Sequence, residues 1–161
     1  LAKHPDDFDL SLLLANAHLA LGNAEKAVAY AERAWAIRPG AAESARTLGL
    51  SLEKGGQTQR AQEILQAAAQ RAPADASAQL NFANFLARQN RFADAFPYYR
   101  RALDAEPRDA AIYYNMGVAY ERSGAVQNAI EAYEAALHLD PGFGAAAAQR
   151  KKLLENDSPI R

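Results

Sequence analysis

Proline recurs along this chain at a constant interval of 34 residues. Five of the seven prolines stand in this register: Pro5, Pro39, Pro73, Pro107 and Pro141. Alanine repeats at the same interval in two further registers: Ala27, Ala61, Ala95 and Ala129, and Ala34, Ala68, Ala102 and Ala136. A fixed period of this length is typical of stacked repeats, in which each unit packs only on its neighbours. The spacing therefore predicts a repeat array without a single central core, and a function carried by a surface.

The residues between the prolines favour two helices in each repeat. Alanine, leucine, glutamate, glutamine and arginine are common, whereas the β-branched residues that favour strands are scarce. The first helices are expected near 8–21, 42–55, 76–89 and 110–123, and the second helices near 25–37, 59–71, 93–105 and 127–139. We predict an all-α fold: a right-handed α-α superhelix of four full repeats plus a C-terminal capping helix.

The proline register also divides the chain into segments. These are the end of a preceding repeat (1–7), four repeats (8–41, 42–75, 76–109 and 110–143), a capping helix (144–155) and a flexible tail (156–161). The capping helix carries Arg150 and Lys151 where earlier units have apolar or small residues, which favours an end to the stack. Because Pro5 is in register without a full repeat before it, we expect the chain to be the C-terminal part of a longer array.

Local signals mark the ends and the packing faces of the helices. Gly22, Gly56, Asn90 and Gly124 share one register at the end of the first helices, where a left-handed residue is expected. Asp75 and Asp109 are expected to cap the N-termini of the following helices. Pro97 predicts a helix start or a mild kink rather than a break. Small residues in register are expected to let paired helices approach closely: Ala15, Gly49, Ala83 and Gly117.

Charge and motifs exclude several classes of function. The net charge of -1 argues against a nucleic-acid or membrane-surface binder, which would carry a basic excess. The chain has no cysteine, and no apolar run approaches the length that inserts into a membrane. No phosphate loop, nucleophile motif or metal-ligand spacing appears. We therefore predict a protein that is not an enzyme and needs no cofactor or metal.

These registers resemble the tetratricopeptide repeat. The resemblance covers residues 8–141, and the fourth unit carries it most fully: Tyr113, Met116, Gly117, Tyr120, Gly124, Ala129, Tyr133, Ala136 and Pro141. The resemblance implies that the first helices line a concave groove, which binds an extended peptide or a partner helix.

Helical spacing separates the groove face of each first helix from its packing face. The groove face is expected to present Leu12, Asn16, Arg46, Leu50, Leu80, Asn81, Asn84, Arg88, Tyr114, Asn115, Val118 and Arg122. Asn81 and Asn115 share a register and resemble the asparagine ladder of O-linked N-acetylglucosamine transferases; the alternative is that both are ordinary helix-surface residues. Chaperone-binding repeats hold the C-terminal carboxylate of their partner with a clamp of basic residues and asparagine. Only Arg46 and Asn81 match that clamp, so the tail of a heat-shock protein is disfavoured as the partner.

The favoured function is a non-catalytic scaffold that binds a protein or peptide partner in the groove. Two alternatives stay open at this point. In the first alternative, the chain is a regulatory or substrate-docking segment of a larger enzyme, such as a glycosyltransferase. In the second, it is a scaffold that self-assembles into a homo-oligomer. The alanine-rich, arginine-over-lysine composition is typical of bacterial proteins. It does not fix the location, for which the cytoplasm is slightly favoured over the periplasm.

Overall fold

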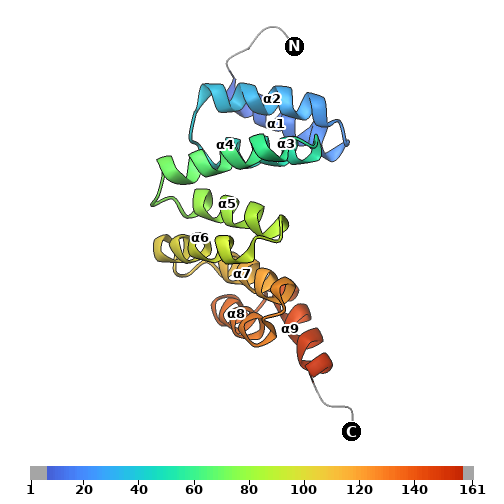
Figure 1. Cartoon of the computed structure of the whole chain (residues 1–161), viewed down its shortest axis with the longest axis vertical. Coiled ribbons are helices and arrows are strands. Elements are labelled where there is room, and N and C mark those ends of the chain that lie inside the picture. The colour runs from blue at the N-terminus through green and yellow to red at the C-terminus, as the bar shows by residue number, and fades with distance from the viewer. Residues whose placement is uncertain (1–6, 158–161) are drawn as a thin grey trace. The chain divides into compact units, whose positions relative to one another are not determined.

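The computed structural model describes residues 7–157, and every regular element in this range is a helix (Figure 1). The first helices of the repeats are α1 (Phe8–Ala20), α3 (Ala42–Lys54), α5 (Ala76–Arg88) and α7 (Ala110–Ser123). The second helices are α2 (Ala24–Ile37), α4 (Thr58–Arg71), α6 (Phe92–Ala105) and α8 (Val126–Leu139), and α9 (Gly144–Asp157) follows them. The predicted all-α repeat fold is confirmed.

The bounds of the eight paired helices lie within one residue of those expected at each end. The predicted division into repeat segments stays a prediction. Its terminal parts, the end of a preceding repeat and the flexible tail, fall largely on residues 1–6 and 158–161, which lie outside the described residues.

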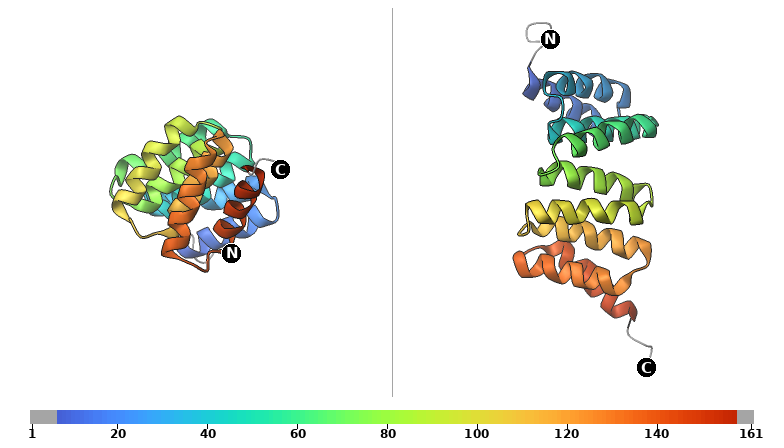
Figure 2. Two further views of the ribbon diagram at one scale, coloured as in Figure 1. Left: turned by 90° about the horizontal axis from the view of Figure 1, so that it is seen from below. Right: turned by 60° about the vertical axis from the view of Figure 1, so that its left-hand side comes forward.

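The chain forms two compact units, residues 1–82 and 83–161, and α5 runs across the division. We call these the first unit and the second unit. In the first unit, α1 packs on α2, α3 packs on α4, and α3 also contacts both α1 and α2. In the second unit, α7 packs on α8 and α6, and α9 packs on α8. Figure 2 shows these pairings from two further directions.

Four turns confirm the expected left-handed residues. The backbone φ angle is 73° at Gly22, 74° at Gly56, 59° at Asn90 and 83° at Gly124. Asn90 is the one residue other than glycine with a positive φ angle among those that the structure describes. Each residue reverses the chain between a first and a second helix, and a side chain is rarely accepted in this conformation.

Aspartate caps begin three of the first helices. The Oδ1 atom of Asp75 accepts from the backbone N–H of Ala78 at 3.0 Å, and that of Asp109 accepts from Ala111 at 2.7 Å. Both were predicted. Asp7 adds a third cap, accepting from the N–H of Leu10 at 2.9 Å. Each bond satisfies one of the backbone donors that the first turn of a helix leaves unpaired.

Removing one of these caps tests this account of the helix ends. The substitution Asp109→Ala is expected to lower the free energy of unfolding by about 1 kcal/mol, because an N–H at the start of α7 loses its acceptor. Urea unfolding followed by circular dichroism measures the change. Asp109→Asn keeps an acceptor oxygen and is the matched control. An equal loss in both variants would contradict the capping role.

Small residues set the distance between paired helices. Ala15, Ala27, Ala83 and Ala95 are all fully buried. Where the first helix carries glycine, a large side chain fills the space: a Cβ atom added at Gly49 would lie 2.7 Å from Leu65, and one added at Gly117 would lie 2.7 Å from Tyr133. The expected close approach is therefore confirmed at these positions.

The helix α6 runs through Pro97 without a break, as expected. It begins at Phe92, so Pro97 stands inside the helix and does not start it. Proline there removes one backbone donor to the preceding turn, and the neighbouring bonds keep the helix continuous.

Candidate functional site

Most residues predicted for the groove lie in two hollows, one in each unit. The first-unit hollow has a volume of about 300 Å³ and is lined by Ala42, Glu43, Arg46, Asp75, Ser77, Leu80 and Asn81. The second-unit hollow has a volume of about 160 Å³ and is lined by Asn84, Ala87, Arg88, Tyr99, Asn115, Val118, Ala119 and Arg122. Three predicted residues line the former and five line the latter.

The repeat register explains why these side chains meet. The second-unit hollow lies between α5 and α7, which are the first helices of consecutive repeats. Asn84 and Arg88 are four residues apart and share a face of α5, whereas Val118 and Arg122 occupy the equivalent face of α7. A period of one repeat therefore places equivalent faces of α5 and α7 along the same hollow.

Other predicted residues lie elsewhere. Leu12 is only 4% exposed and packs in the core with Phe8 and Ala34, so its placement in the groove is wrong. The helical spacing placed Leu12 on the groove face, but it packs in a cluster with Ala34 of α2, against which Ile37 and Ala41 also lie. Asn16 is exposed on α1 and Leu50 is half-buried on α3, both outside the two hollows.

Tyr114 also lies outside the two hollows. Its ring is half-buried, with its centroid 5.8 Å from that of Tyr133 and 5.0 Å from that of Phe143. Phe143 follows the last proline of the register, so no repeated position signalled this contact.

The two asparagines of the suggested ladder bond to the protein's own backbone. The Nδ2 atom of Asn81 donates to the carbonyl of Ala42 at 3.0 Å, and that of Asn115 donates to the carbonyl of Ala111 at 2.7 Å. An amide group has a second N–H and an oxygen that accepts two bonds. Both residues line a hollow and keep this capacity, so their use as a ladder stays a prediction.

A buried tyrosine supports the wall of the second-unit hollow. The hydroxyl of Tyr99 donates to Oδ1 of Asn84 at 2.7 Å, which fixes the orientation of this amide. Burial raises the pKa of the Tyr99 hydroxyl well above its ordinary value, although the charges of Arg88 and Arg122 oppose the shift. The helical spacing did not place Tyr99 among the groove residues, so its contact with the hollow was missed.

Arg122 is held by two neutral groups. Its Nη2 atom donates to Oδ1 of Asn90 at 2.8 Å, and its Cζ atom lies 5.5 Å from the centroid of the Phe92 ring. An amide and an aromatic ring orient a guanidinium group without cancelling its charge.

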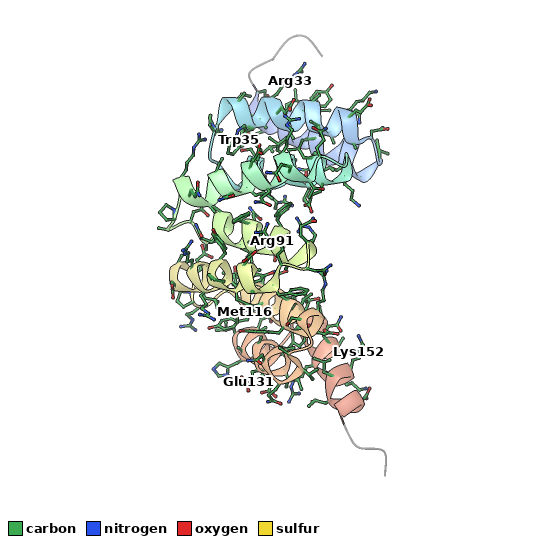
Figure 3. The ribbon with its side chains drawn as sticks, in the orientation of Figure 1. Arg33, Trp35, Arg91, Met116, Glu131 and Lys152 are labelled. Carbon is green, nitrogen blue, oxygen red and sulfur yellow. The ribbon has the colours of Figure 1, made fainter. Side chains whose placement is uncertain are left out.

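Several other described cations pair with carboxylates. Arg60 lies 2.7 Å from Glu32, and Arg150 lies 2.7 Å from Glu134. Lys152, labelled in Figure 3, pairs with Glu121 at 3.2 Å.

The two hollows therefore differ in charge. The second-unit hollow is lined by two arginines and by neither aspartate nor glutamate. The first-unit hollow carries Arg46 together with the carboxylates of Glu43 and Asp75. Of these, Asp75 already accepts from a backbone N–H as a helix cap.

Two further features bear on the class of the site. Among residues 7–157, histidine and acidic side chains nowhere gather in a group that would hold a metal ion. In the same range, none of the helices combines the length and the apolar character needed to cross a membrane.

Known proteins resemble this chain in sequence and in structure. A stretch of 60 residues, 37% of this chain, is 30% identical to the Hsp70-Hsp90 organizing protein of Triticum aestivum, and it spans about a tenth of that protein's length. The crystal structure of TTC0263, a thermophilic TPR protein of Thermus thermophilus, matches 95% of this chain and 84% of its own with a TM-score of 0.82 at 20% identity.

The TPR protein YrrB, described as having an unusual peptide-binding site, matches 91% of this chain and 93% of its own with a TM-score of 0.61 at 20% identity. At these identities the structural likenesses show the fold. The sequence pattern of the tetratricopeptide repeat matches residues 1–42, 46–108 and 83–142. With its helices paired in this register over nearly its whole length, the chain belongs to the tetratricopeptide repeat family.

Proposed function

We propose that this chain is a non-catalytic interaction module whose second-unit hollow binds an extended peptide with acidic side chains. The observation that carries the proposal is the set of groups that surround Arg122. This guanidinium group lines a hollow without carboxylates and is held by neutral partners, so it keeps its charge for a ligand. Membership of a family of interaction modules, and the likeness to a protein described as peptide-binding, support the same class of function.

The lining residues offer complementary contacts to such a peptide. The amide groups of Asn84 and Asn115 carry donors and acceptors that suit a peptide main chain of any sequence. Arg122 offers a guanidinium group that matches the geometry of a carboxylate. Val118 adds an apolar surface between the polar groups. This combination favours an acidic segment over a neutral one without requiring a particular sequence.

The test compares capped hexaglutamate with capped hexaglutamine, both without terminal charges, by isothermal titration calorimetry. The wild-type chain is expected to bind hexaglutamate more tightly. The substitution Arg122→Ala is expected to weaken this binding about ten- to a hundredfold, since a charge-assisted hydrogen bond contributes about 1.5–3 kcal/mol.

Arg101→Ala is the matched control. Arg101 is exposed on α6 of the same unit, lies over the ring of Tyr98 at 4.9 Å, and does not line the hollow. Its loss removes the same charge from the chain and is expected to change the affinity by less than about twofold, because exposed charges outside the site are screened. The proposal fails if hexaglutamine binds as tightly as hexaglutamate, or if both variants weaken binding equally.

A further inference from the structure

We infer that Asn90 is a positioning residue for the second-unit hollow: its side-chain amide orients Arg122 toward an acidic ligand while leaving the charge of Arg122 intact. The inference rests on the proposed function and names the residue that tunes the same site. Asn90 itself does not line the hollow.

The turn alone does not account for an asparagine at this position. Asn90 has a φ angle of 59°, and the three equivalent turns use glycine, which adopts this conformation without strain. Asparagine tolerates the left-handed region better than most residues but less well than glycine. A glycine at this turn would therefore satisfy the backbone, and the contribution that only asparagine makes is the amide oxygen 2.8 Å from Nη2 of Arg122.

The turn between α5 and α6 holds Arg122 from two sides. Asn90 accepts one N–H of the guanidinium group, and the ring of Phe92, two residues later, lies 5.5 Å from Cζ. A guanidinium group has five N–H donors, so the others stay available to a ligand. A free arginine side chain loses rotamer entropy when a ligand fixes it. Holding Arg122 in advance reduces this cost and so increases affinity.

The choice of an amide rather than a carboxylate has a consequence for specificity. Elsewhere in the described chain, Glu32 and Glu134 hold arginines by ion pairs, which both orient and neutralise them. A carboxylate at position 90 would hold Arg122 at least as firmly but would compete with the carboxylate of a ligand. The neutral amide therefore combines orientation with an uncompensated charge.

Two substitutions separate these roles. Asn90→Gly removes the amide and is expected to leave the midpoint of thermal unfolding unchanged or higher, while weakening hexaglutamate binding about three- to tenfold. Asn90→Asp keeps a residue that tolerates the turn and keeps an acceptor for Arg122. It is expected to weaken hexaglutamate binding about tenfold, and to leave the weak binding of hexaglutamine unchanged. A purely structural role predicts that Asn90→Asp binds hexaglutamate like the wild type, and this result would overturn the inference.

A double-mutant cycle assigns the effect to Arg122. Asn90→Gly is expected to have no further effect on hexaglutamate binding in a chain that already carries Arg122→Ala. An equal loss in both backgrounds would mean that Asn90 acts through another residue, and would overturn the inference.

A readout without ligand distinguishes this inference from the proposed function. Nuclear magnetic resonance relaxation of the Arg122 Nε–H group is expected to show a more mobile side chain in Asn90→Gly than in the wild type. Unchanged mobility would overturn the positioning role, whatever the peptide does. Failure of the wild-type chain to bind hexaglutamate would instead overturn the proposed function, while the mobility measurement would still decide whether Asn90 holds Arg122.

Discussion

Replacing Gly117 by alanine is expected to lower the free energy of unfolding by about 1–3 kcal/mol, the usual cost of overpacking a core. An added Cβ atom would lie 2.7 Å from Cε1 and 2.8 Å from Cδ1 of Tyr133, closer than carbon atoms approach. Alanine favours a helix over glycine by about 1 kcal/mol, so the loss is expected despite a gain in helix propensity. Urea unfolding followed by circular dichroism measures the difference.

The rigidity of Tyr133 is what makes this substitution costly. Its ring is fully buried, and its hydroxyl donates to Oε2 of Glu121 at 2.8 Å, so the ring is held at both ends. Gly49→Ala is the matched control: the added atom would meet the branched end of Leu65, also at 2.7 Å, but a leucine tip changes rotamer more readily than an anchored ring moves.

The two glycine variants are therefore expected to differ, with Gly49→Ala the less costly. In addition, Tyr133→Leu combined with Gly117→Ala is expected to cost less than the sum of the single changes, because the smaller side chain makes room for the methyl group. Equal losses in the two glycine variants, or additive losses in the pair, would contradict this account of the packing.

The fold was predictable from sequence because its signals are local and repeat. Proline, a left-handed turn residue and a small residue recur in register, and each fixes a helix end or a packing face within one repeat. The same register predicted that Asn84, Arg88 and Arg122 lie on the groove faces of their helices. It failed for Leu12, because α1 packs that face into the core.

The chemistry of the site was less predictable, because it depends on contacts between residues far apart in sequence. Asn90 and Arg122 are 32 residues apart, and Asn81 and Ala42 are 39 apart. Neither spacing equals the repeat period, so no register signals them. In sequence, Asn90 stands out only as a substitute for glycine in a turn. The bond to Arg122, which gives its side chain a second role, appears only when α7 is placed beside the turn.

Raising the pH above about 10 is expected to destabilise the second unit steeply, by up to about 2.7 kcal/mol for each pH unit. Burial raises the pKa of Tyr99 and of Tyr133 above the ordinary value of tyrosine, and the bond to Glu121 raises that of Tyr133 further. In this range the unfolded chain releases both protons, whereas the folded chain keeps them. The unfolded state therefore binds fewer protons, so the free energy of unfolding falls as pH rises.

Urea unfolding at a series of pH values between neutral and about 11 measures this slope, and the ultraviolet absorbance of tyrosinate follows the ionisation itself. Tyr99→Phe and Tyr133→Phe each remove one titrating hydroxyl, so each is expected to reduce the alkaline slope by about half. Tyr133→Phe also leaves Glu121 without one of its donors and is expected to cost about 1 kcal/mol at neutral pH. A slope unchanged in the double variant would show that these two buried hydroxyls are not its source. The other five tyrosines are common to the wild type and the double variant, so tyrosinate absorbance near pH 10 that is larger in the folded wild-type chain than in the folded double variant would contradict the raised pKa of these groups.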